Sequence, residues 1–94
     1  MVRLFIRHAV TDYDAWRQVY DDFDAERRSM GVVGDAVYRA VDDPNDVTVW
    51  HDFDTREGAQ GFVNSDRLHE VMAKAGVASV PQTWMVTEAG GTRS

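Results

Sequence analysis

The sequence contains no cysteine and only two prolines among its 94 residues. The lack of cysteine excludes disulfide bonds, catalytic thiolates and zinc–thiolate sites. No apolar run approaches the roughly 18 residues of a membrane-spanning helix. Residues 2–10 already have the composition of a strand, so we expect no signal peptide. Together these absences favour a cytoplasmic protein.

Positively charged residues are also scarce, because the sequence has ten Lys and Arg residues but sixteen Asp and Glu residues. The resulting formal net charge of −6 repels both nucleic acids and anionic membranes. We therefore expect neither as a partner. Hydrophobic residues make up 44% of the chain and charged residues 28%, which is ordinary for a globular protein of one domain.

The order of the predicted segments is strand, helix, strand, strand, helix, strand. The predicted strands are residues 2–10, 35–41, 47–53 and 82–88. The predicted helices span residues 12–30 and 55–76, the second with a break near Asn64. A turn over residues 42–46 is expected to join the middle strands into an antiparallel hairpin.

Alternating side chains give each strand two faces, and the first helix has one continuous buried stripe. The stripe has spacings of three and four and comprises Trp16, Tyr20, Phe23, Arg27 and Met30. Asp12 is expected to cap this helix at its start. Gly31 suits the left-handed position that ends it.

This order predicts an α+β, ferredoxin-like split βαβ domain over residues 1–88, with a flexible tail at 89–94. Both helices should cover one face of a four-stranded antiparallel sheet. The other face is too apolar to be left in water, with Phe5, Tyr38, Trp50 and Met85 among its residues. We therefore expect a homodimer formed through this face.

Three stretches resemble a known superfamily: DYDAWRQVYDDFDAERRSMG, VYRAVDDPNDVTVWHDFDT and GFVNSDRLHEVMAKAGV. Together with the element order, they make residues 2–88 similar to the dimeric α/β-barrel superfamily. The similarity is greatest to its antibiotic-biosynthesis-monooxygenase-like and cyclase-like small proteins. The resemblance implies that two sheets associate into a barrel and that ligands bind between sheet and helices. It does not specify a reaction.

The resemblance also tests one branch of the superfamily. Haem-degrading members carry a tryptophan and, ten residues later, a histidine on the second helix. The corresponding positions here are Phe62 and Met72. This departure argues against haem degradation, and we expect no tightly bound cofactor.

His8 and His51 are the candidate catalytic residues, because the predicted register directs both toward the helices from adjacent central strands. The two imidazoles could approach each other or a shared ligand. A neutral imidazole could take a proton from a phenol or enol. The alternative is that both are core histidines with hydrogen bonds to backbone or water.

Large aromatic side chains are the candidate pocket walls. They are predicted to lie between sheet and helices, and they are Trp16, Tyr20, Phe23, Phe62 and Trp84. They could hold a flat aromatic substrate. The alternative is that these rings simply fill the core.

Arg39 is a cation on a helix-facing row of its strand, where it could bind a carboxylate or enolate. The alternative is a strand-end arginine whose stem packs while its head reaches solvent. The acidic residues lie on solvated surfaces and do not form a calcium loop, so we expect no metal.

These features favour a small dimeric enzyme, a cofactor-independent monooxygenase or cyclase acting on an aromatic or polyketide-like molecule. The rival interpretation is a non-catalytic module that binds a small ligand or a partner. The two differ in one observable feature. An enzyme should have a pocket that reaches His8 and His51, with at least one imidazole nitrogen free of protein partners.

Overall fold

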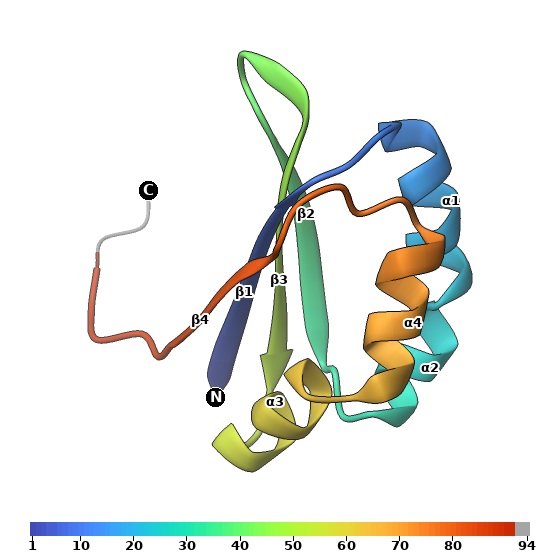
Figure 1. The fold of residues 1–94 in the computed structure, drawn as a ribbon. Helices are drawn as coiled ribbons and strands as arrows, with labels where there is room; N and C mark the ends of the chain where they lie inside the picture. The colour runs from blue at the N-terminus through green and yellow to red at the C-terminus, as the bar shows by residue number, and fades with distance from the viewer. Residues whose placement is uncertain (92–94) are drawn as a thin grey trace.

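A computed structural model describes residues 1–91 and contains one four-stranded sheet with helices packed on it (Figure 1). The elements in chain order are β1 (Val2–Ala9), α1 (Tyr13–Asp22), α2 (Asp24–Ser29), β2 (Gly34–Ala40), β3 (Asp43–Phe53), α3 (Arg56–Val63), α4 (Asp66–Lys74) and β4 (Gln82–Val86). The strand order is β2-β3-β1-β4, and every neighbouring pair is antiparallel. This confirms the ferredoxin-like α+β fold.

Local capping explains where the helices begin. The side chains of Asp12, Thr55 and Ser65 each accept a backbone N–H from the first turn that follows. The predicted helix 12–30 is interrupted at Phe23, whose ψ of −1° separates α1 from α2. The break near Asn64 and the left-handed Gly31, with φ of 100°, are confirmed.

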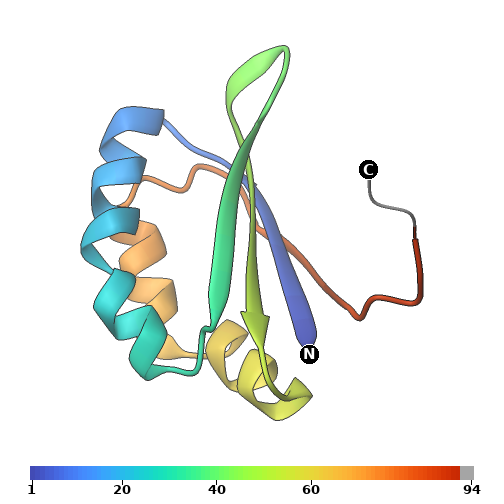
Figure 2. The same ribbon diagram turned by 180° about the vertical axis from the view of Figure 1, so that it is seen from behind.

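The hairpin between β2 and β3 is tighter than predicted. β3 begins at Asp43, so residues 43–46 belong to the strand and the turn is confined to residues 41–42. The register shifts between Arg39 and Ala40, and the side chain of Asp43 accepts the backbone N–H of Asn45. The sequence DDPND carries strong turn signals, but pairing with β1 and β2 draws its last four residues into β3. The hairpin tip extends beyond the other strands in both views (Figure 2).

The helices lie on one side of the sheet in both figures, and the core lies between them and the sheet. β1 and β3 contribute their predicted inner rows to this core, and among these residues Leu4, Val47 and Phe53 are at most 1% exposed. Trp16, Phe23 and Phe62 close it from the helical side. The predicted register of both central strands is therefore confirmed.

β4 has the opposite face assignment to the one predicted. Trp84 pairs with Phe5 and lies on the outer face, whereas Met85 pairs with Leu4 and packs against the core. The prediction failed because the strand reads Trp-Met-Val. Three consecutive apolar residues contain no alternation, and a slip of one residue exchanges the two faces.

The end of the described chain has no regular structure. Residues 89–91 are exposed, and residues 92–94 of the predicted tail lie outside the described residues. Among the helices described, none is long and apolar enough to cross a membrane.

Candidate functional site

A cavity of about 40 Å³ lies between the inner face of the sheet and the helices. Most of its wall is apolar or aromatic and consists of Ile6, Trp16, Tyr20, Phe23, Val49, Phe62, Leu68, Val71, Met72 and Ala75. The remaining wall residues are His8, Arg27 and His51. This space admits water-sized molecules, whereas pockets for drug-sized ligands measure about 300–1,000 Å³.

The two histidines line this cavity from positions well apart along the central strands. His51 pairs with Leu4 and His8 pairs with Val47, so four residues of strand separate them. At about 3.3 Å per residue, that separation is roughly 13 Å along the strands. The expectation that the two imidazoles could approach each other is wrong, because the antiparallel register keeps them apart. Both still line one cavity and could meet a shared ligand.

Each imidazole lies against aromatic rings of the helices, His51 against two and His8 against one. The His51 ring lies 5.0 Å from Phe62 and 6.1 Å from Tyr20, measured between ring centroids. The His8 ring lies 5.8 Å from Trp16. His8 is 5% exposed and His51 2%. None of their four ring nitrogens has a hydrogen-bond partner within residues 1–91. A buried imidazole without such a partner costs stability.

Burial also sets the charge of both histidines. It lowers the pKa of His51 to about 4, and the positive charge of Arg27 acts in the same direction. Burial likewise lowers the pKa of His8. Both imidazoles are therefore neutral at pH 7, and each has one nitrogen that can accept a proton.

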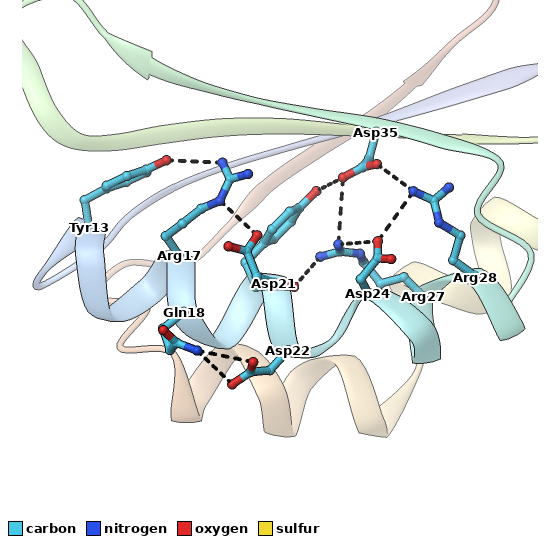
Figure 3. Close-up of polar contacts among 10 residues, drawn as sticks. Tyr13, Arg17, Gln18, Asp21, Asp22, Asp24, Arg27, Arg28 and Asp35 are labelled. Carbon is cyan, nitrogen blue, oxygen red and sulfur yellow. Dashed lines mark hydrogen bonds and ion pairs between the residues drawn. The ribbon is translucent and has the colours of Figure 1, made fainter.

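Beside His51 lies a polar cluster that links α1, α2 and β2 (Figure 3). The Tyr20 hydroxyl donates to Asp35 Oδ2 at 2.5 Å. Asp35 also accepts a hydrogen bond from Arg28 Nη2 at 3.3 Å. Burial raises the pKa of Tyr20, and the hydrogen bond to Asp35 raises it further. Tyr20 therefore remains a protonated wall residue and does not act as a base.

Arg27 is the cation at the centre of this cluster. Its Nη1 donates to the backbone oxygen of Tyr20 at 2.8 Å, and its Nη2 donates to Asp24 Oδ1 at 3.0 Å. Its Cζ lies 3.6 Å from the centroid of the Tyr20 ring, a cation–π contact. The side chain is only 3% exposed. Arg27 thus places a buried positive charge in the cavity wall.

Six of the predicted site residues meet at the cavity: His8, Trp16, Tyr20, Phe23, His51 and Phe62. Trp84 does not, because it stacks on Phe5 on the outer face, with ring centroids 5.1 Å apart. Its predicted place between sheet and helices is wrong.

Arg39 is also outside the cavity wall. It lies on the helix side of β2 as predicted, but it is exposed, and its Cζ covers the Tyr13 ring at 3.9 Å. Its Nε donates to the backbone oxygen of Pro44. This is the alternative arrangement, in which the stem packs at the end of a strand.

Sequence reasoning missed two residues of the site, Arg27 and Asp35. Arg27 belongs to the predicted helical stripe, and a cation among buried aromatic positions was the available signal. Asp35 occupies the inner row of β2, opposite His51. Nothing in the sequence alone could pair Asp35 with Tyr20.

The described part of the chain contains no cluster of side chains suited to binding a metal ion. No group of three or more His, Asp or Glu side chains there converges on a point that could hold an ion.

No family model matches this chain, and no curated protein matches it in sequence. Solved structures do match its fold. SnoaB, a cofactor-independent oxygenase from Streptomyces nogalater, matches with a TM-score of 0.79 at 13% identity, over 99% of this chain and 97% of its own. A structure of an antibiotic biosynthesis monooxygenase matches at 0.73 and 8% identity, over 96% and 100%.

A conserved protein from Methanosarcina mazei matches with a TM-score of 0.72 at 12% identity, over 90% of this chain and 89% of its own. At such identities the likeness establishes the fold alone. It confirms, at that level, the resemblance to structures of antibiotic biosynthesis monooxygenases.

Proposed function

We propose that this protein is a cofactor-independent oxygenase acting on an aromatic or polyketide-like molecule with an acidic C–H or O–H group. The observation that carries the proposal is the pair of buried, neutral imidazoles in an aromatic-walled cavity. Both imidazoles lack a hydrogen-bond partner within the described chain, and burying such groups lowers the stability of the folded protein. Such groups cluster at functional sites. The shared fold with an oxygenase, SnoaB, adds support.

The chemistry would begin with proton transfer from the substrate to His51. For a CH₂ group flanked by aromatic rings, the resulting carbanion passes one electron to dioxygen, and the two radicals join in a C–O bond. The imidazolium returns its proton to the peroxide, which then loses water. One CH₂ group and one O₂ thus become one C=O group and one H₂O. In a cyclase, the same carbanion would instead attack an internal carbonyl.

Substrate entry requires the cavity to enlarge, because 40 Å³ cannot hold an aromatic ring. Leu68, Val71 and Met72 of α4 form one wall of the cavity. Methionine adapts readily to a changed shape. On the surface, Arg67 of α4 makes two hydrogen bonds of 2.8 Å to Glu26 of α2. We propose that α4 moves away from α2 when substrate binds.

Oxygen uptake with an anthrone-type substrate tests this function. His51→Ala should abolish uptake, whereas His69→Ala is the matched control, because His69 is exposed on α4. Conversion of the substrate without oxygen uptake would favour a cyclase. Full activity of His51→Ala would refute the role of His51.

The second candidate is a non-catalytic binding module, and the small size of the cavity favours it. Calorimetric titration with flat aromatic molecules separates the two. A binding module should bind such a ligand with measurable affinity and should not convert it in the presence of oxygen. The His51→Ala variant should still bind the ligand.

We also propose a homodimer formed through the outer face of the sheet. Tyr38, Trp84 and Val86 are 55%, 43% and 40% exposed there. Such an apolar surface favours a protein partner. Light scattering should give twice the 10.6 kDa chain mass. Trp50→Asp should reduce it to a monomer, because an unpaired buried charge costs several kcal/mol. A wild-type monomer at micromolar concentration would exclude the dimer.

A further inference from the structure

Arg27 has one nitrogen, Nε, that the cluster around it does not use. Both terminal nitrogens are engaged, by the backbone oxygen of Tyr20 and by Asp24. The Nε–H group is buried and has no acceptor among residues 1–91. Leaving a buried donor on a charged group without an acceptor is costly. Stacking on Tyr20 and bonding to Asp24 explain why Arg27 is held, but they leave this donor unexplained.

The surroundings of Arg27 favour an anionic oxygen as that acceptor. Arg27 and His51 line the same cavity, and the positive charge of Arg27 reaches the His51 imidazole. The carboxylates on this side, Asp24 and Asp35, accept hydrogen bonds from Arg27, Arg28 and the Tyr20 hydroxyl. Once the cavity has enlarged, an anion in it would thus lie beside Arg27, with its ring against the remaining walls.

We propose that Arg27 binds the ionised oxygen of a phenolic or enolic ligand through its Nε–H group, beside His51. This inference rests on the proposed function, since it names the group by which the substrate is recognised. Arg27 would hold the oxygen while His51 takes the proton. The ligand is then a molecule bound as a phenolate or enolate, and not as a neutral hydroxyl compound.

The acid–base properties of His51 agree with this division of roles. An imidazole with a pKa of about 4 is a weak base for an ordinary phenol, whose pKa is near 10. A guanidinium beside the oxygen lowers the pKa of the phenol, and the new anion raises that of the imidazolium. Arg27 would therefore narrow the mismatch by lowering the pKa of the phenol, and the new anion would offset the effect by which Arg27 lowers the pKa of His51.

Optical titration of 4-nitrophenol tests the proposal without any turnover, because its ionised form is yellow. The wild-type protein should lower the apparent pKa of the bound probe by about one unit, which means about tenfold tighter binding of the anion. 4-Nitroanisole, which has nearly the same shape and cannot ionise, should bind at least about tenfold more weakly than the anion. Tyr20 stays protonated over this range, so its hydroxyl does not titrate with the probe.

Two variants make the test specific to Arg27. Arg27→Gln should remove the preference for the ionised probe, and Arg27→Lys should restore only part of it. Arg28→Gln is the matched control, because Arg28 contacts the same two aspartates but lies outside the cavity wall. It should behave like the wild type.

Three results would overturn the proposal: no preference for the anion in the wild type, a full preference in Arg27→Gln, or an equal loss in Arg28→Gln. If Arg27→Gln fails to fold, the comparison of nitrophenol with nitroanisole on the wild-type protein decides alone. Failure of the oxygenase proposal would leave this binding result intact, since the titration involves no oxygen chemistry.

Discussion

On the two central strands, β1 and β3, the polar side chains of the outer face are paired and the two histidines of the inner face are not. On the outer face, Arg3 makes hydrogen bonds of 2.8 and 3.0 Å to Asp52, and Arg7 makes bonds of 3.1 and 2.7 Å to Asp46. On the inner face, His8 and His51 are more deeply buried than either arginine, yet no residue in the described chain bonds to their rings.

This difference shows which polar groups the fold itself uses. The outer ion pairs join adjacent strands through partly exposed arginines, and the buried Asp52 keeps two hydrogen bonds to Arg3. The inner imidazoles give up hydration without gaining a bond in return. This cost to stability is the observation on which the proposed ligand site rests.

The largest expected effect is on the apolar layer that encloses the histidines. Phe23 is 5% exposed and lines the cavity, so Phe23→Ala should lower the free energy of unfolding by about 3–5 kcal/mol. Val80→Ala, at a position 90% exposed, is the control and should change little. Urea denaturation measures both. If Phe23→Ala has the same urea midpoint as the wild type, the junction of α1 and α2 does not pack on the sheet.

Because His51 is buried, we expect the free energy of unfolding to decrease at acidic pH. Its pKa is about 4 in the folded protein, against 6.5 for an ordinary histidine. Between these values the unfolded chain holds a proton that the folded chain does not, so stability falls as the pH is lowered from 6.5 to 4. The loss due to His51 should be about 3 kcal/mol.

Unfolding curves at a series of pH values measure this loss, and His51→Leu is the control that should lack the contribution. A wild type and a variant with the same pH dependence would mean that His51 is hydrated or bonded in solution.

A pair of substitutions compares the two faces directly. Replacing His51 by Leu should stabilise the protein by about 1 kcal/mol at pH 7, because an unpartnered imidazole gives way to an apolar side chain. Asp52→Ala should destabilise it by about 1–2 kcal/mol, because the bonds to Arg3 are lost. Thermal unfolding of both variants measures the difference. Destabilisation by His51→Leu would indicate a structural histidine.

The smallest expected effect concerns the ion pair between α4 and α2. Arg67→Ala should leave the unfolding midpoint unchanged, because both partners are exposed. If α4 moves to admit ligand, the same variant should speed ligand association in stopped-flow measurements. Glu70→Ala is the control, since Glu70 contacts Arg67 within α4 only. Unchanged association rates in Arg67→Ala would remove the proposed role of this ion pair.

Much of the site was predictable from local patterns. The stripe Trp16, Tyr20, Phe23 follows helical spacing, and strict alternation places His8 and His51 on the inner rows of β1 and β3. Trp84 and Arg39 were less predictable. β4 lacks alternation, and Arg39 lies near the end of β2, where an inward-facing side chain can still reach solvent.

The sequence by itself determined the order of the elements, their caps and the inner faces of the two central strands, because these depend on neighbours within a few residues. Only the tertiary structure decided the rest. The register between β1 and β3 separates the histidines along the cavity, and the packing of α2 on β2 brings Arg27 and Asp35 to Tyr20. Such contacts join residues far apart in the chain, and no local periodicity encodes their distance.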